Sequence, residues 1–210
     1  MKKIISVFLS VIMLVTSICF AVSANASVNK KSGEYDYTFV SADKIAIKKY
    51  TGSESTVNIP SKIDGFTVTE ISGAFNVMDS LKKVVIPSTV TTISASFEYD
   101  SNLAEVTIPS SVKTIDANSF CKNTALKSIV IPSSVTTLDA FQDCTSLTSI
   151  KIGDNISDIS AYAFANSPVY ENQYKKGIVY IGKCLLYCNT EVYKSSKVTV
   201  KDGTKTIANE

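Results

Sequence analysis

The chain of 210 residues contains no histidine and no tryptophan, and all 21 of its basic residues are lysines, so it also lacks arginine. Without histidine, Ser–His–Asp catalysis, Cys–His catalysis and histidine-ligated zinc sites are excluded. Arginine is the usual bidentate partner of phosphate and guanine. Because no lysine-dense patch replaces it, the composition argues against nucleic acid as a partner.

Metal binding and acid–base chemistry would therefore rest on carboxylates, lysines, tyrosines and cysteines. The 19 acidic residues are scattered among polar positions and form no evident pair of the kind that glycosidases use. No C-x-x-C pair occurs, so a tetrathiolate zinc site is not expected. We expect no enzyme activity, no cofactor and no metal ion.

The N-terminus has the pattern of a secretory signal peptide. Lys2 and Lys3 precede a long apolar run, residues 4–22, and the tripeptide Ala-Asn-Ala that ends at Ala26 supplies the small residues that signal peptidase requires. Cleavage after Ala26 would remove 2 lysines and no acids, leaving 19 lysines against 19 acidic residues. A neutral mature chain gives no reason to expect electrostatic capture of nucleic acid or anionic lipid.

Two alternatives exist for this N-terminal segment. The apolar run is long enough for an uncleaved membrane anchor. A lipoprotein signal at Cys19 fits less well, because the bulky Ile18 stands where such a signal needs a small residue. We expect a secreted or cell-surface protein that is not inserted in a membrane after cleavage.

A repeated phrase ending in Ile-Pro occupies the middle of the chain. Its copies are 22, 23 and 21 residues apart, and Gly153 replaces the proline in the last copy. Apolar residues recur five and two residues before each anchoring isoleucine and four and seven residues after it, and a phenylalanine closes each unit. The anchors are Ile86, Ile108, Ile131 and Ile152, and the phenylalanines are Phe75, Phe97, Phe120, Phe141 and Phe164.

This fixed period predicts a solenoid. The segment L-x-x-V-x-I alternates like a short strand, proline ends that strand, and V-x-x-I forms the next side of the coil. Each unit buries its apolar face only against its neighbours. A β-sandwich with evenly spaced strands is the alternative, but it would not require five positions to recur in register over four units.

The pattern L-x-x-I-x-I-P-x-x-V-x-x-I-x-x-x-x-F resembles the leucine-rich repeats of the BspA-like, or Treponema-type, family. Cys144 occupies a position where that family often carries cysteine or asparagine, and Asn123 and Asp100 hold it in earlier units. The resemblance implies a right-handed leucine-rich-repeat coil, mostly β with an irregular or short-helical convex side. It also implies a secreted or surface-exposed bacterial protein that mediates adhesion.

The segments around the repeats complete the predicted organisation. Tyr37–Val40 and Lys44–Tyr50 are predicted to form a hairpin that caps the open end of the solenoid. After the repeats, Ile178–Ile181 and Cys184–Tyr187 are predicted to form a second hairpin. The predicted parts are a signal peptide (1–26), a hairpin cap with a degenerate first coil (27–70), the repeats (71–166), an inserted hairpin (167–197) and the start of an incomplete repeat (198–210). In the incomplete repeat, Val200 takes the anchor position and Ile207 the apolar position seven residues later. Because that repeat lacks its phenylalanine, we expect the sequence to be a fragment of a longer protein.

The first candidate binding surface is a ladder of side chains that alternate with the core positions of the L-x-x-V-x-I segments. Extended concave faces of solenoids bind partners in many repeat proteins. This ladder contains no aromatic residue, so a plain solvated face is the alternative. The candidate ladder residues are Lys83, Val85, Glu105, Thr107, Ser128, Val130, Ser149 and Lys151.

The second candidate is a group of tyrosines in the inserted hairpin. Tyrosine combines a flat apolar ring with a hydroxyl, which suits contact with sugar rings or proteins. The alternative is a hairpin that packs its own aromatic side chains. The candidate residues are Tyr170, Tyr174, Tyr180 and Tyr187, with Tyr162 and Tyr193 nearby.

Four cysteines remain after signal cleavage. Cys121 and Cys144 lie at near-equivalent positions of adjacent coils, so a disulfide between them is possible in a secreted protein. Cys184 and Cys188 would need a turn between them, because they are too far apart within one extended strand. Four buried free thiols are the alternative.

Two functions are compatible with these features. The first is a non-catalytic binding or adhesion module that presents many weak contacts to an extracellular protein or polysaccharide. The second is a structural spacer or display segment of a longer cell-wall-associated protein, with no ligand of its own. Changing Lys83, Glu105 and Lys151 to alanine would abolish partner capture in the first case and change nothing in the second.

Overall fold

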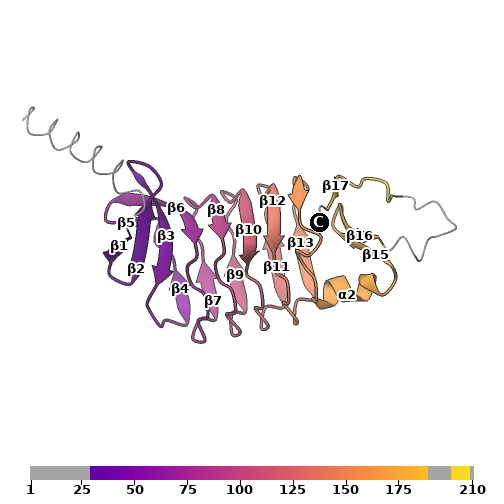
Figure 1. Cartoon of the computed structure of the whole chain (residues 1–210), viewed down its shortest axis with the longest axis horizontal. Helices are drawn as coiled ribbons and strands as arrows, with labels where there is room; N and C mark the ends of the chain where they lie inside the picture. The colour runs from indigo at the N-terminus through magenta and orange to yellow at the C-terminus, as the bar shows by residue number, and fades with distance from the viewer. Residues whose placement is uncertain (1–28, 189–199, 209–210) are drawn as a thin grey trace, which may run out of the picture.

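The computed structural model describes residues 29–188 and 200–208, so the predicted signal peptide and Tyr193 lie outside the described residues. The described chain forms an elongated stack of coils, in which strands of successive coils lie side by side (Figure 1). This is the predicted solenoid, and turns rather than helices connect its strands up to residue 166. Within the described part, no helix is both long and apolar enough to span a bilayer.

The predicted antiparallel hairpin covers the first coil, but its first strand begins and ends earlier than the predicted Tyr37–Val40 and pairs with a further strand that was not predicted. Strand β1 (Lys30–Ser32) pairs with β2 (Tyr35–Phe39), which pairs with β3 (Lys44–Tyr50). β3 then runs parallel to β6 (Phe66–Ser72), and β5 (Lys62–Ile63) is antiparallel to the start of β6. The hairpin therefore continues the sheet of the first coil and covers an edge that would otherwise be open.

The longest sheet is built mainly from the V-x-x-I segments of the repeats. After β6 it continues in parallel through β8 (Thr92–Ser94), β10 (Thr114–Ser119), β12 (Thr137–Ala140) and β14 (Asp158–Ile159). One buried apolar residue of each strand aligns with the next, in the series Ile71, Ile93, Ile115, Leu138 and Ile159. Stacking these side chains between coils supplies the burial that a single unit lacks.

The L-x-x-V-x-I segments form shorter sheets on another side of the coil. Strands β4 (Thr56–Asn58), β7 (Lys83–Val85) and β9 (Glu105–Thr107) pair in parallel, as do β11 (Ser128–Ile131) and β13 (Ser149–Ile152). Within the described chain no ladder joins β9 to β11. This side of the solenoid is therefore interrupted, whereas the long sheet is continuous.

A row of phenylalanine rings stacks inside the solenoid. The row consists of Phe75, Phe97, Phe120, Phe141 and Phe164, with successive ring centroids 4.9–5.7 Å apart and ring planes within 11° of parallel. Four of these phenylalanines, Phe75 to Phe141, have φ between 61° and 70°, in the left-handed region that costs energy for a residue with a β-carbon. Complete burial of the rings offsets this cost in each coil.

A row of buried polar side chains accompanies the rings, at the position where the repeat carries asparagine or cysteine. The Met78 N–H donates to Asp100 Oδ1 at 2.6 Å, and the Asp100 N–H donates to Asn123 Oδ1 at 3.0 Å. The Cys144 thiol donates to the Phe120 carbonyl at 3.2 Å. Asp100 and Asn123 each satisfy a backbone N–H of the preceding coil, which explains why polar groups are kept in the interior.

The C-terminal part contains the predicted second hairpin and a helix that the sequence pattern did not predict. Helix α2 (Pro168–Tyr174) leads into β15 (Ile178–Ile181), which pairs antiparallel with β16 (Cys184–Cys188). Pro168 lies in the first turn of α2, where its missing N–H and fixed φ are tolerated. Strand β17 (Thr206–Ile207) runs parallel to β16.

The expected apolar position of the incomplete repeat is not occupied by Ile207. Thr206 is buried and its hydroxyl donates to the Ile156 carbonyl, whereas Ile207 is 66% exposed. Val200 is exposed as well. The placement predicted for these two apolar residues is therefore wrong. For Ile207 the reason is that Thr206 takes the buried position of β17, and a shift of one residue in a strand moves every side chain to the opposite face.

Candidate binding site

The predicted ladder residues lie on the shorter sheets and face solvent. Six of the eight are exposed, while Lys83 and Val85 are half-buried. Lys83 and Glu105 form an ion pair between β7 and β9, with Nζ and Oε2 2.6 Å apart. Because both side chains stay accessible, this pair adds little stability. The binding role of the ladder stays a prediction.

A shallow groove of about 420 Å³ lies where β9 and β11 fail to pair. Residues 104–108 and 128–130 line it, and four ladder residues are among them. Its lining contains no aromatic side chain, and Glu105 is its one charged residue among those described. Aromatic and arginine side chains dominate binding energy at most protein interfaces. This groove therefore offers a partner few strong anchors.

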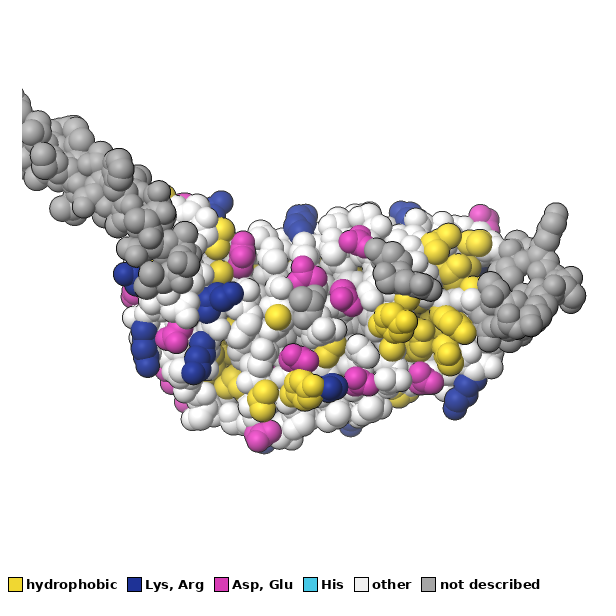
Figure 2. All heavy atoms as spheres, viewed as in Figure 1, with side chains coloured by type: hydrophobic (Ala, Val, Ile, Leu, Met, Phe, Trp, Pro, Cys, Tyr) yellow, Lys and Arg dark blue, Asp and Glu magenta, His cyan; other side chains and the backbone are white. Residues whose placement is uncertain are grey.

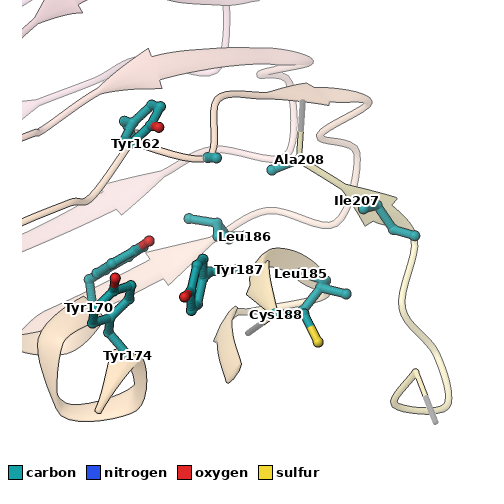
Figure 3. Close-up of a pocket in the computed structure, with 10 residues that line it drawn as sticks. Tyr162, Tyr170, Tyr174, Leu185, Leu186, Tyr187, Cys188, Ile207 and Ala208 are labelled. Carbon is teal, nitrogen blue, oxygen red and sulfur yellow. The ribbon is translucent and has the colours of Figure 1, made fainter. Parts of the chain in front are cut away.

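A second groove, which we call the tyrosine groove, lies near the C-terminal end and has a volume of about 360 Å³ (Figure 3). Helix α2 contributes Tyr170 and Tyr174, β16 contributes Tyr187, and Tyr162 lies in the turns after β14. The full lining is Ala161, Tyr162, Tyr170, Tyr174, Leu185, Leu186, Tyr187, Cys188, Ile207 and Ala208. Three of the four predicted tyrosines are thus brought together.

Three of these rings form one wall of the tyrosine groove. The centroids of Tyr170 and Tyr174 are 5.7 Å apart and the rings stack, and Tyr174 packs against Tyr187 at 4.6 Å. Tyr162 lies apart from them, above the rings of α2 in the close-up (Figure 3). Tyr170 is buried, but Tyr162 is 58% and Tyr174 43% exposed. The groove therefore presents two accessible aromatic rings.

The described residues that line the tyrosine groove are uncharged near neutral pH. Burial, followed by the nearby Tyr174 and Tyr187, raises the pKa of Tyr170 to about 12. The hydrogen bond with Tyr174 raises the pKa of Tyr187. These phenols stay protonated near neutral pH, and a phenol can donate a hydrogen bond as well as accept one. No lysine, aspartate or glutamate is among the described residues that line the groove.

Gln173 holds helix α2 against the hairpin. Its Nε2 donates to the Tyr180 carbonyl at 2.9 Å, and its Oε1 accepts from the Tyr180 N–H at 3.0 Å. This double contact places the tyrosines of α2 beside β16. The Tyr180 side chain itself lies in a different groove, where its hydroxyl accepts from the Lys201 N–H at 2.9 Å. Tyr180 is therefore separate from the other three predicted tyrosines.

The described cysteines are free thiols. The Cys121 thiol donates to Asn118 Oδ1 at 3.9 Å, and the Cys144 thiol donates to a backbone carbonyl. Burial raises the pKa of both thiols to about 12. The possible disulfide between Cys121 and Cys144 is therefore not formed in this structure. Both residues are free thiols, as in the alternative. Cys188 departs from that alternative in being only half-buried.

Sequence reasoning missed the apolar floor of the tyrosine groove. Leu185 and Leu186 are both buried there, so this stretch of β16 does not alternate between a core face and a solvent face. The apolar run Cys-Leu-Leu-Tyr-Cys was the available signal, since a continuous apolar strand is covered on both faces. In the described chain, no group of three or more cysteine or acidic side chains could hold a metal ion.

Parallel strands stacked coil on coil, the phenylalanine row and the buried Asp/Asn/Cys row together define a leucine-rich-repeat solenoid. The family model described as "BspA type Leucine rich repeat region (6 copies)" matches residues 44–167 and 122–210. These matches span more than half of the sequence, so the chain belongs to the BspA-type leucine-rich-repeat family. No curated protein shows significant sequence similarity to it.

Several solved structures of bacterial leucine-rich-repeat proteins are similar to this one. A leucine-rich repeat protein from Bacteroides capillosus is 22% identical, and the match covers 59% of this chain and 97% of that one with a TM-score of 0.51. The T. pallidum protein TpLRR is 23% identical, with 62% of this chain and 74% of that one covered and a TM-score of 0.48. A leucine rich cell surface protein from Faecalibacterium prausnitzii is 22% identical over 70% of this chain and 48% of its own length, with a TM-score of 0.47.

Proposed function

We propose that this protein is a non-catalytic binding or adhesion module that acts outside the bacterial cell, either secreted or at the cell surface. The observation that carries the proposal is the tyrosine groove, a concave site with two exposed aromatic rings and no charged side chain among the described residues that line it. Hydrophobic side chains gather near this end of the molecule in the space-filling view (Figure 2). Exposed apolar clusters in a concavity are typical of interaction sites.

The extracellular location is part of the same proposal. It is supported by the predicted signal peptide and by membership of a family that includes bacterial surface proteins. The partner would be an extracellular protein or polysaccharide. The competing function is a structural spacer without a ligand, and the solvated, non-aromatic ladder is compatible with it.

A panel of immobilised extracellular polysaccharides and extended peptides would separate these functions. The variants are Tyr162→Ala/Tyr174→Ala, which removes the exposed rings, and Lys83→Ala/Glu105→Ala/Lys151→Ala, which removes the ladder charges. We expect the wild-type chain and the ladder variant to bind the same polymer and the tyrosine variant to lose it. Loss in the ladder variant alone would move the site to the ladder, and no binding by the wild type would favour the spacer.

A further inference from the structure

We propose that the tyrosine groove binds a proline-rich segment of a partner protein in the polyproline II conformation. This inference rests on the binding function proposed above and specifies its ligand class. The features that carry it are the stacked rings on one side of the groove, the separate exposed ring of Tyr162, and the absence of charged side chains among the described lining residues.

The walls of the tyrosine groove have a shape and polarity that suit a polyproline II segment. Polyproline II segments dock in grooves lined by aromatic rings, where the flat ring faces receive proline side chains. Tyr174 and Tyr187 lie 4.6 Å apart with their planes tilted by 38°, so they present an angled aromatic wall. Leu186 is buried in the lining, and Tyr162 stands apart from this wall. This arrangement suits proline rings without requiring a deep cavity.

The hydrogen-bonding groups of the groove also suit a polyproline II segment. A proline residue has a carbonyl acceptor and no N–H, and a polyproline II backbone leaves its carbonyls without internal partners. Tyr174 and Tyr187 share one hydrogen bond, which uses one of their two hydroxyl hydrogens, and the remaining phenol groups can donate to such carbonyls. A glycan presents many hydroxyls that also need acceptors, and phenol oxygens are the only side-chain oxygens among the described residues that line the groove. This set of polar groups favours peptide carbonyls over sugar hydroxyls.

Strand addition, the other common mode of peptide binding, has little edge to use at this groove. An extended peptide adds to a sheet only where a strand edge is free. β16, which carries Tyr187, pairs with β15 along one side, and on the other side β17 pairs with Cys184 and Leu185. The edge left at the groove is therefore at most residues 186–188, so ring faces and phenol groups offer a peptide more contact than backbone pairing does.

The 210 residues of this sequence do not themselves supply such a segment. The 5 prolines of this chain are Pro60, Pro87, Pro109, Pro132 and Pro168, each isolated from the others by many residues. None of them forms a proline-rich stretch. A partner segment that is already extended in solution also loses little entropy on binding, which favours a shallow site of this kind.

The test uses the full chain and three probes: decaproline, a Gly-Ser peptide of equal length and chitotetraose, each titrated by calorimetry. We expect saturable binding of decaproline alone. Tyr162→Ala and Tyr174→Ala should each weaken it by about tenfold, because an aromatic anchor is removed. Tyr174→Phe keeps the ring and should lose less, while Lys83→Ala/Lys151→Ala on the ladder should bind like the wild type. Unchanged thermal unfolding of each variant shows that the fold is retained.

The other outcomes distinguish this inference from the function on which it rests. Equal binding of decaproline and the Gly-Ser peptide, or decaproline binding that the tyrosine variants retain, would overturn the polyproline proposal. Tyrosine-dependent binding of chitotetraose without decaproline binding would overturn it too, but would leave the binding module in place. Failure to bind any probe overturns the polyproline proposal, and the wider polymer panel then decides the function.

Discussion

Replacing Asp100 by asparagine should remove a loss of stability that develops as the pH rises. The Asp100 carboxyl is buried, its Oδ1 accepts one hydrogen bond from the Met78 N–H, and its Oδ2 has no partner. Burial is the main cause that raises the pKa of Asp100 to about 7, the Met78 N–H lowers this pKa, and the charge of Asp79 raises it. Asn123, at the equivalent position of the next coil, shows that an amide fits the site.

The sign and size of the effect follow from that raised pKa. Below the ordinary value of 3.8 the carboxyl is protonated in both the folded and the unfolded chain, and full stability is present. As the pH rises towards and through about 7, the unfolded chain ionises freely while the folded chain must bury a charge, so stability falls. A rise in pKa from 3.8 to about 7 corresponds to at most about 4 kcal/mol. Relaxation of the protein around the buried charge reduces the expected loss of stability to about 2–4 kcal/mol.

Urea unfolding at pH 4, 6 and 8 measures this directly. We expect Asp100→Asn to gain about 2–4 kcal/mol relative to the wild type between pH 4 and pH 8. The chain has no histidine, so no imidazole titrates in this window. Asp202→Asn is the matched control: it changes an exposed carboxylate that does not contribute to the raised pKa of Asp100, and it should shift stability by less than about 0.5 kcal/mol. A stability difference between Asp100→Asn and the wild type that is the same at every pH would refute this account.

Three further predictions concern the core and the coil contacts. Phe120→Ala should lower the free energy of unfolding by about 3–5 kcal/mol because its ring is fully buried in the stack, and a variant that unfolds in urea like the wild type would contradict that packing. Gly153→Pro restores the proline that the other units carry, but it should lower the thermal midpoint because a β-carbon at this position would overlap Ser133 Cα. A higher thermal midpoint would show that the two coils are not in such close contact. Cys121 and Cys144 should stay unreactive toward a thiol reagent until the chain unfolds, since burial raises both thiol pKa values, and rapid labelling of the native protein would be the contrary result.

The repeated part of the fold could be predicted from the sequence because one physical rule applies in every unit. A residue that is apolar at the same position in each coil must face the same neighbour above and below it. Phe97 and Phe120 follow this rule and stack with planes 2° from parallel. The N-terminal hairpin also follows from local alternation, and its second strand was predicted with the same bounds, Lys44–Tyr50.

The other features of the structure depend on contacts between distant residues, which no short sequence pattern predicts. The interruption between β9 and β11 changes pairing without changing the apolar pattern. Helix α2 spans only seven residues, and its position depends on the contacts of Gln173 with Tyr180 across the chain. The sequence predicts the tyrosines as one group, but it does not show which of their side chains contact one another, because those contacts depend on where α2 packs. The prediction therefore includes Tyr180, although its side chain lies in a different groove.

The most direct test of the central claim is to map the binding surface on the tyrosine rings themselves. Ring-labelled tyrosine NMR spectra would be recorded while a binding polymer from the panel, or decaproline, is added to the full chain. The account predicts shifts of the exposed Tyr162 and Tyr174 rings and of Tyr187, and no shift for Tyr99, which is exposed elsewhere on the solenoid, or for Tyr180. Saturable binding that leaves the rings of the groove unchanged would contradict the claim that this groove is the binding site.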